Sequence, residues 1–321
     1  MLHTSIIELV GNTHVLRLCR MSERCGANIF IKLEQLNPGG SHKVRIAINM
    51  VLHAEARGVL TRGSGQTILA PTGGNTGIGL AIVAAVFGYR LILVIPDNYS
   101  AAKQRLLRLY GAQIVLSDSA LGNNSHGEKA TELAIENPHY VLLDQQSDPA
   151  NPDAHRKATA LEILEVFSGT HIDYFIGGIG TGGHITGIGE VLKRVYPLMR
   201  IIGVQPEGCD LLGNRFVRHS IQGLAVGIIP ANLRVDLIDR MISVDIAAAK
   251  EMVYTAMRQE GVSVGLSTGA NLAAAHEVAR AAPPGANILT LAYDAAEPYL
   301  DELAEEMLPC AASTEADDEL P

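Results

Sequence analysis

The sequence predicts an α/β protein with mainly parallel sheets and with helices covering both faces of each sheet. Along most of the 321 residues, short apolar runs rich in β-branched residues alternate with longer segments of helical periodicity. This alternation is typical of strand–helix–strand units, in which consecutive strands lie parallel. Hydrophobic residues form 47% of the chain and charged residues 18%, which indicates a folded globular protein rather than a disordered chain.

The expected strands share a length of four to six residues and an apolar, β-branched composition. In chain order they are 28–33, 67–70, 91–95, 113–116, 140–143, 174–177, 201–204 and 288–292. The segments with helical periodicity between them are 100–110, 155–167, 185–195 and 247–259. The last residues, 311–321, are polar and acidic without periodicity, and we expect them to form a disordered tail.

Charge and hydropathy exclude several classes of function. The formal net charge is −9 and no run of basic residues offers nucleic acid a binding surface. The longest apolar stretches, such as 78–87, are too short to span a membrane. The N-terminus lacks the basic and apolar regions of a signal peptide. We therefore expect a soluble, cytoplasmic protein that binds neither nucleic acid nor membranes.

The cysteines and histidines give no sign of a metal site. The four cysteines show no CxxC spacing, and reduced thiols are usual in the cytoplasm. The eleven histidines form no HxH or HExxH pair, and no cluster of acidic residues or cysteines accompanies them. The sequence therefore predicts a protein without a bound metal.

Lys43 is expected in the first turn of a helix that follows Pro38-Gly39-Gly40. Ser41 is a good N-cap. The apolar face of this helix is formed by Val44, Ala47, Ile48, Val51 and Leu52. The positive end of a helix dipole disfavours another cation, which lowers the pKa of a lysine there and prepares its amine to attack an aldehyde. A solvated surface lysine would also fit this position, if Lys43 is considered alone.

Two glycine-rich loops, at 71–77 and 177–187, each follow a strand and open a helix. Glycine lets backbone N–H groups converge on an anion, although tight strand-to-helix turns also use it. The second loop lacks both the acidic residue of a dinucleotide fingerprint and the Gly-Lys-Ser/Thr ending of a P-loop. Its dense glycines, together with Thr181 and Thr186, favour a compact phosphate monoester.

The polar residues near these loops suit an aromatic ring and a carboxylate. Asn75 can donate to a phenolic oxygen, and Thr72 and Thr76 can clasp a carboxylate together with backbone N–H groups. Plain helix capping would explain the same residues. Ser267 precedes the expected helix 270–281, where it can be a cap or can hydrogen-bond a pyridine nitrogen without fully protonating it.

Taken in order, these motifs resemble the cysteine synthase family, the β-replacement branch of fold-type II pyridoxal-phosphate (PLP) enzymes. The resemblance covers residues 5–303 and depends on the ordered set rather than on any single motif. The set contains 11–13, 32–34, 37–43, 71–77, 149–152, 180–187, Gly223 with Gly227 and Pro230, 265–270 and 294–300.

The resemblance implies a tryptophan synthase β-like fold of two α/β domains with the cofactor between them. Residues 1–40 and 152–310 would form the larger, PLP-binding domain, and 41–151 a smaller, mobile domain. Lys43 would carry PLP as a Schiff base and act as the catalytic residue. The other implied cofactor contacts are Asn75, Gly180, Thr181, Gly182, Gly183, His184 and Ser267. The implied substrate contacts are Thr72, Gly73, Gly74, Thr76, Gln145 and Gln146.

The activity implied by the resemblance is β-replacement on an O-activated L-serine, such as O-acetylserine, by a homodimeric enzyme. The reaction would pass through α-aminoacrylate and join a small nucleophile to the β-carbon, giving cysteine or another β-substituted alanine. One alternative is β-elimination or racemisation of serine- or threonine-type substrates. A second is a catalytically silent relative that only binds PLP or an amino acid.

Several positions depart from the family pattern. Val44 replaces an aspartate, Gly73 a serine, Gln146 an aromatic residue and His184 a threonine, and 295–298 also differ. Neutral drift would explain these changes. The alternative is a changed substrate, because Gly73 and Gln146 alter size and polarity at the amino-acid site. On that hypothesis the enzyme makes a specialised β-substituted alanine, or uses a nucleophile other than sulfide, such as an amine.

Overall fold

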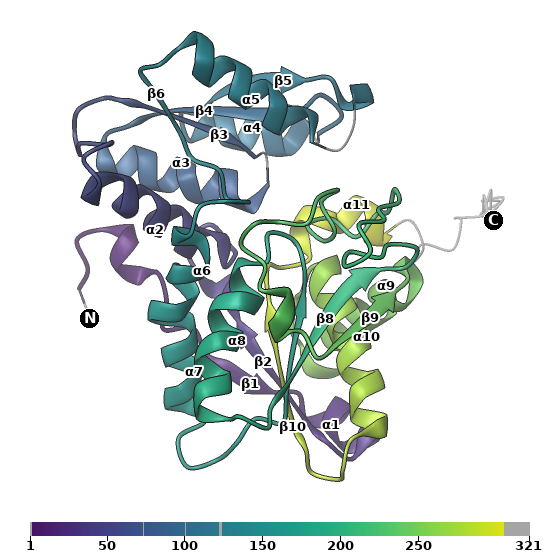
Figure 1. Ribbon diagram of the computed structural model, residues 1–321. Helices are drawn as coiled ribbons and strands as arrows, with labels where there is room; N and C mark the ends of the chain where they lie inside the picture. The colour runs from purple at the N-terminus through teal and green to yellow at the C-terminus, as the bar shows by residue number, and fades with distance from the viewer. Residues whose placement is uncertain (1, 73, 100, 122–123, 305–321) are drawn as a thin grey trace, which may run out of the picture.

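Among residues 2–72, 74–99, 101–121 and 124–304, which the computed structural model describes, the strands form two sheets at opposite ends of the molecule (Figure 1). In spatial order the larger sheet contains β1 (Val15–Arg17), β2 (Asn28–Leu33), β10 (Asn287–Ala292), β7 (Tyr174–Gly178), β8 (Arg200–Pro206) and β9 (Arg240–Val244). The smaller sheet contains β5 (Gln113–Ser117), β4 (Arg90–Pro96), β3 (Thr67–Pro71) and β6 (Tyr140–Leu142). Only β1 and β2 pair in antiparallel fashion among these strands.

This arrangement confirms the predicted α/β class with mainly parallel sheets. All eight predicted strands are present, with ends that differ by at most two residues. The strands β1 and β9 were not predicted. β1 is only three residues long, and β9 lies at the edge of the sheet with Arg240 and Ser243 exposed, so neither has the continuous apolar run of a central strand.

Helices connect the strands, and short 3-10 and π-helical turns occur between or next to them. The α-helices are α1 (Cys19–Cys25), α2 (Lys43–Ala56), α3 (Asn75–Phe87), α4 (Ala101–Leu109), α5 (Ser125–Glu136), α6 (Ala150–Ala154), α7 (Ala160–Val166), α8 (Gly183–Val195), α9 (Ile246–Thr255), α10 (Leu266–Ala281) and α11 (Leu300–Ala304). The 3-10 turns are Ile6–Leu9, Glu34–Leu36, Ser119–Leu121, Val235–Leu237 and Glu297–Tyr299, and the π-helical turns are His155–Thr159 and Ala256–Glu260.

Both sheets are buried on two faces. On the larger sheet, α7 and α8 pack against one face, where Phe175 points, and α1, α9 and α10 pack against the other, where Ile176 points. On the smaller sheet, α2, α3 and α4 share a core with one face, and α5 covers the other. Apolar residues on both faces explain why the central strands show almost uninterrupted hydrophobic runs.

The cap of α2 and the starts of two other helices differ from the sequence-based expectation. Lys43 begins α2 as predicted, but His42 occupies the N-cap position and Ser41 Oγ accepts the Lys43 N–H at 3.3 Å from one residue further out. The expected helix 155–167 continues a helix that already begins at Ala150, because Pro152 is tolerated in a first turn. Helix α10 begins at Leu266 rather than at 270, so Ser267 lies inside its first turn and is not its cap.

Two other expectations are not decided by the fold. The boundaries of a larger domain (1–40 with 152–310) and a smaller one (41–151) stay a prediction. The expected tail 311–321 lies outside the described residues. No helix in the described part of the chain is long and apolar enough to cross a membrane.

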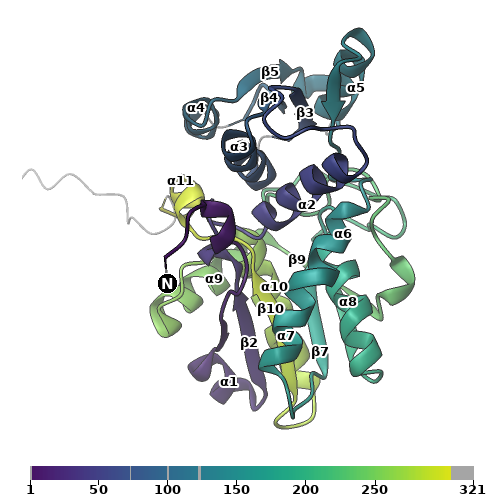
Figure 2. The ribbon, with the colours of Figure 1, turned by 90° about the vertical axis from the view of Figure 1, so that its left-hand side faces the viewer.

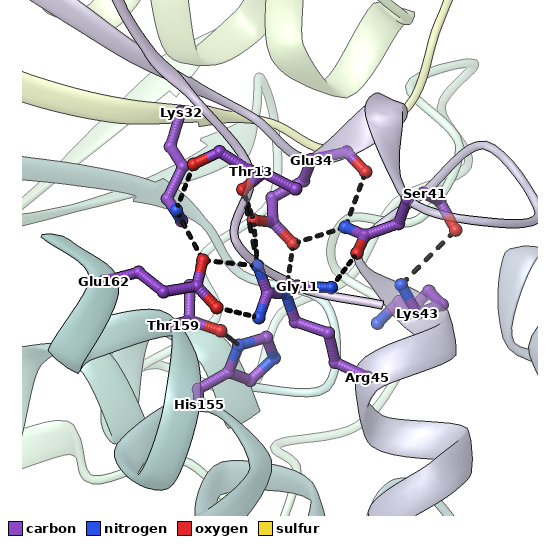
Figure 3. Close-up of polar contacts among 11 residues, drawn as sticks. Gly11, Thr13, Lys32, Glu34, Ser41, Lys43, Arg45, His155, Thr159 and Glu162 are labelled. Atoms are coloured by element: carbon purple, nitrogen blue, oxygen red, sulfur yellow. Dashed lines mark hydrogen bonds and ion pairs between the residues drawn. The ribbon is translucent and has the colours of Figure 1, made fainter. Parts of the chain in front are cut away.

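A cluster of buried charges ties the first turn of α2 to the larger sheet (Figure 3). The Arg45 guanidinium donates to Glu34 Oε2 at 2.6 Å and to Glu162 Oε1 at 2.6 Å, and Lys32 Nζ lies 2.7 Å from Glu162 Oε2. The side chains of Lys32, Glu34 and Arg45 are at most 3% exposed. Burial alone would raise the pKa of Glu162, but its bonds to Arg45 and Lys32 lower that pKa to about 2.

Removing Arg45 should destabilise the protein strongly, because the buried Glu34 carboxyl group would lose the guanidinium that pairs with it. For Arg45→Met we expect the free energy of unfolding to fall by about 3–5 kcal/mol in urea denaturation. The matched control is Arg240→Met, whose ion pair with Glu277 is about half exposed and should contribute less than about 1 kcal/mol. Equal losses in the two variants would contradict this account.

Candidate active site

A cavity of about 880 Å³ lies between the two sheets and collects most of the predicted site residues. Strands β3, β7 and β10 all direct their carboxyl ends toward it, the usual location of ligand sites in open parallel sheets. The predicted residues on its wall are Lys43, Thr72, Gly74, Asn75, Thr76, Gln145, Gln146, Gly180, Thr181, His184 and Ser267.

The helices α2, α3, α8 and α10 all begin at this wall. Lys43, Asn75 and Ser267 lie in the first turns of α2, α3 and α10, and His184 lies in the first turn of α8. The first N–H groups of a helix have no partner within it, and the aligned peptide dipoles place partial positive charge there. The cavity is therefore suited to anionic groups such as a phosphate or a carboxylate.

Lys43 has an amine suited to nucleophilic and proton-transfer chemistry. Its side chain is partly buried and lines the cavity. Burial disfavours the charged ammonium and lowers the pKa of Lys43 to about 8, although the nearby Asp294 carboxylate acts in the opposite direction. Near neutral pH a useful fraction of the amine is therefore uncharged.

Asp294 is a buried carboxyl group at the same wall, and its role was not predicted from the sequence. Its Oδ2 accepts hydrogen bonds from Asn75 Nδ2 and Tyr299 Oη, both at 2.7 Å. Burial raises the pKa of Asp294, while these two hydrogen bonds and the charges of Lys103 and Lys43 oppose the rise. The bond to Asp294 fixes the orientation of the Asn75 amide at the cavity.

A short chain of hydrogen bonds joins the two glycine-rich loops. Thr76 Oγ1 donates to Gln145 Oε1 at 2.6 Å. Asn151 Nδ2 donates to the Gln145 carbonyl at 2.7 Å and to Thr181 Oγ1 at 3.0 Å. Next to this chain, Gln146 Oε1 is buried and has no hydrogen-bond partner among the described residues. It is an acceptor that a ligand with an N–H or O–H group would satisfy.

The glycines of the second loop are required by close packing. A Cβ at Gly180 would lie 2.1 Å from the carbonyl oxygen of Gly223, and one at Gly183 would lie 1.9 Å from Asn151 Oδ1. Gly182 has a φ of 74° and precedes α8. Gly182 and Gly183 do not line the cavity, so any contact from them must come through backbone N–H groups at its edge. Gly73, the remaining predicted residue, lies outside the described residues.

Other residues of the wall were not predicted as site residues. They include His42, Tyr99, Lys103, Tyr293, Asp294 and Tyr299. In the described residues no group of three His, Cys, Asp or Glu side chains is arranged to hold a metal ion. The motif at 294–300 was noticed, but nothing in its local pattern showed that Asp294 pairs with Asn75 across 219 positions of the sequence.

Comparison with known proteins agrees with this geometry. The family model described as "Pyridoxal-phosphate dependent enzyme" matches residues 6–294. The chain belongs to this family. It is 39% identical to the O-ureido-L-serine synthase of Streptomyces lavendulae over 300 residues, 93% of this chain and 91% of the relative. It is 38% identical to a cysteine synthase of Staphylococcus aureus, over 92% of this chain and 95% of that enzyme.

Solved structures show the same fold. A crystal structure of O-ureido-L-serine synthase superposes with a TM-score of 0.91 at 37% identity and covers 99% of this chain and 98% of that chain. The O-acetylserine dependent cystathionine beta-synthase from Helicobacter pylori gives a TM-score of 0.88 at 34% identity, over 94% and 98% of the two chains. The fold is that of the cysteine synthase-like, fold-type II members of the family, as the sequence motifs predicted.

The residues at the cavity fit PLP, the cofactor of this family. Lys43 offers an amine of lowered pKa, and the first turns of α8 and α10 provide groups for an anion and for a ring nitrogen. The buried Oδ1 of Asp294 and Oε1 of Gln146 are polar atoms without a partner in the described part of the chain. Such atoms are usually satisfied by a ligand or water.

The lowered pKa of Lys43 predicts how the rate of cofactor uptake depends on pH. Only the uncharged amine attacks an aldehyde, and with a pKa of about 8 its population rises between pH 7 and 9 and then levels off. We expect the rate at which apo-protein develops visible absorption with PLP to follow this curve. The rate for Nα-acetyl-lysine in the same buffers, divided by the uncharged fraction of its own amine, corrects for ionisation of PLP. A corrected rate that still rises steeply above pH 10 would indicate an ordinary exposed lysine.

Proposed function

We propose that the protein catalyses β-replacement on an O-activated L-serine, such as O-acetyl-L-serine. The observation that carries the proposal is that Lys43, the Thr76–Gln145 pair and Ser267 line a single cavity. The similarity to enzymes named O-ureido-L-serine synthase and cysteine synthase supports it. In the reaction the β-carbon–oxygen bond breaks, the oxygen leaves with the electron pair, and a nucleophile that loses a proton takes its place.

Each group at the cavity has a distinct task in this proposal. Bound PLP supplies an electron sink for charge that develops at the α-carbon. The uncharged Lys43 amine accepts the α-proton and later returns it. Thr72, Thr76 and Gln145 hold the substrate carboxylate. Ser267 meets the ring nitrogen with a hydroxyl, which leaves that nitrogen largely uncharged, whereas an aspartate would protonate it.

Contacts across the cavity mouth support a closing movement that excludes water. Lys103 Nζ in α4 donates to Gln222 Oε1 at 3.0 Å, and Gln222 Nε2 donates to Glu302 Oε1 in α11 at 2.8 Å. These half-exposed bonds link helices that pack on different sheets, so they are weak enough to break when substrate enters. We propose that the smaller domain, 41–151, moves about the first turn of α2, which Arg45 anchors to the larger sheet, and that this closure protects the reactive intermediate from water.

We further propose that the enzyme prefers a nucleophile with an N–H or O–H group over sulfide. Gln146 stands where the cysteine synthase pattern has an aromatic residue, and its buried Oε1 lacks a partner among the described residues. A nucleophile such as hydroxyurea would donate to this oxygen, whereas hydrosulfide offers only a weak donor. Attack by its hydroxyl oxygen would give the O-ureido-L-serine in the name of one relative.

The resemblance to the cysteine synthase family also supports a homodimer working in the cytoplasm. Light scattering of the eluting protein would measure its mass, which for one chain is 34.2 kDa. A particle of twice this mass at micromolar concentration is the expected result. A mass of one chain under all conditions would refute the dimer without affecting the proposed reaction.

The visible spectrum of the holoenzyme should change when O-acetyl-L-serine is added and recover when a nucleophile follows. Lys43→Ala should abolish turnover, whereas Lys193→Ala, which removes an ion pair with Asp239 far from the cavity, should leave turnover unchanged.

We expect hydroxyurea to have a higher kcat/KM than sulfide. Gln146→Leu should reduce this ratio about tenfold, the effect of one lost hydrogen bond.

The matched control for Gln146→Leu is Gln259→Leu. Gln259 also has a buried Oε1 without a partner in the described chain, but it lies away from the cavity and should not change the ratio. Pyruvate release without any nucleophile would favour β-elimination instead. A spectrum that no activated serine alters would favour a silent relative, and a preference for sulfide over every other nucleophile would refute the proposed specificity.

A further inference from the structure

Two buried side chains, His184 and Tyr293, meet in the cavity wall where α8 begins. His184 is in the first turn of α8 and Tyr293 follows β10, 109 positions later in the sequence. Tyr293 Oη lies 2.8 Å from His184 Nε2, and the Gly178 N–H donates to the same Oη at 2.8 Å. Gly177 leaves room for the ring, because a Cβ there would lie 2.8 Å from Nε2.

The proton positions follow from counting donors. The Gly178 N–H is only a donor, so Tyr293 Oη accepts that bond and must place its own single proton elsewhere. Its hydrogen-bond partner that can accept a proton is His184 Nε2. Burial raises the pKa of Tyr293, so this proton stays on the phenol in the physiological range, although the Asn271 side chain lies beside the same hydroxyl as a donor and lowers that pKa. Nε2 of His184 is therefore an acceptor and carries no proton.

The proton of the His184 ring must then be on Nδ1. Burial and the charge of Lys43 lower the pKa of His184 to about 3, so the imidazole is neutral and has a single N–H group. Nδ1 has no partner among the described residues, and His184 lines the cavity. Thr181 and the first N–H groups of α8 lie at the same end of the cavity. The ring thus adds one donor to a set already suited to an anion.

We propose that Tyr293 is a positioning residue that holds His184 in the Nδ1–H tautomer, so that the neutral imidazole donates a hydrogen bond to the phosphate of PLP. The inference depends on the cofactor of the family and not on the proposed β-replacement. It gives a role to His184, which stands where the cysteine synthase pattern has a threonine. The pair supplies the donor that the threonine hydroxyl would otherwise provide.

The backbone of Tyr293 ties the same residue to the other two parts of the site. Its carbonyl accepts the His42 N–H at 3.1 Å, next to Lys43, and its N–H donates to Thr268 Oγ1 at 3.0 Å, next to Ser267. The two aromatic rings of Tyr293 and His42 lie 4.9 Å apart. Tyr293→Phe keeps these two backbone bonds and the ring packing, and it removes the hydroxyl with its bonds to His184 and to the Gly178 N–H.

The first test is ¹⁵N NMR of the histidine rings in apo-protein, with the His184 signals identified by their loss in His184→Thr. We expect Nδ1 to be protonated and Nε2 not. In Tyr293→Phe the ring should lose this fixed preference, whereas Tyr196→Phe, whose hydroxyl bonds the Phe167 carbonyl far from the cavity, should not change it. An Nε2–H tautomer in the unaltered protein would overturn the proposal.

The second test compares PLP with pyridoxal, which lacks the phosphate. Tyr293→Phe should weaken PLP binding about tenfold, or about 1.4 kcal/mol, and leave pyridoxal binding unchanged. The ³¹P resonance of bound PLP should shift in the same variant. Equal weakening of both ligands would mean a general structural role, and no weakening of either would mean that His184 does not reach the phosphate. Both results would overturn the proposal, and neither measurement involves a substrate.

Discussion

The position of Arg45 between two buried carboxylates is the constraint on which the site depends. Arg45 is two residues from Lys43 in α2, and its partners come from the turn after β2 and from α7. Helix α2 lies between the two sheets (Figure 2). It packs on the smaller sheet, and the bonds of Arg45 connect its first turn to the larger one. Because removing one partner of a buried ion pair is costly, the first turn of α2 is held in place relative to the larger sheet.

The electrostatics of the cavity follow from this placement. With α2 fixed, the positive ends of four helices converge on one space, which disfavours the lysine cation and favours anionic ligands. Asp294 is the buried acidic group that partly balances them, and its hydrogen bond to Asn75 joins the smaller sheet to the larger one. The burial that lowers the pKa of Lys43 also lowers the pKa of His184 and keeps its ring neutral, so the single ring proton can be directed by Tyr293.

The sequence predicts the fold and much of the site because their signals are local. The central strands are short apolar runs, and Lys43, Asn75 and the glycine-rich loops stand next to the strand ends that position them. The N-caps of helices were less predictable. Helix α2 begins two residues after Ser41, and α10 begins one residue before Ser267, so neither serine occupies the N-cap position. The pairs Asn75–Asp294 and His184–Tyr293 were not predictable, because tertiary packing brings together residues that no local spacing relates.

The central claim is that Lys43 is the residue that holds the cofactor, and chemical trapping tests it most directly. Reduction of the holoenzyme with borohydride would fix PLP on its lysine, and mass spectrometry of the peptides would locate it. The account predicts a single modified residue, Lys43. Modification of Lys103, which also lines the cavity, or of several surface lysines would contradict it.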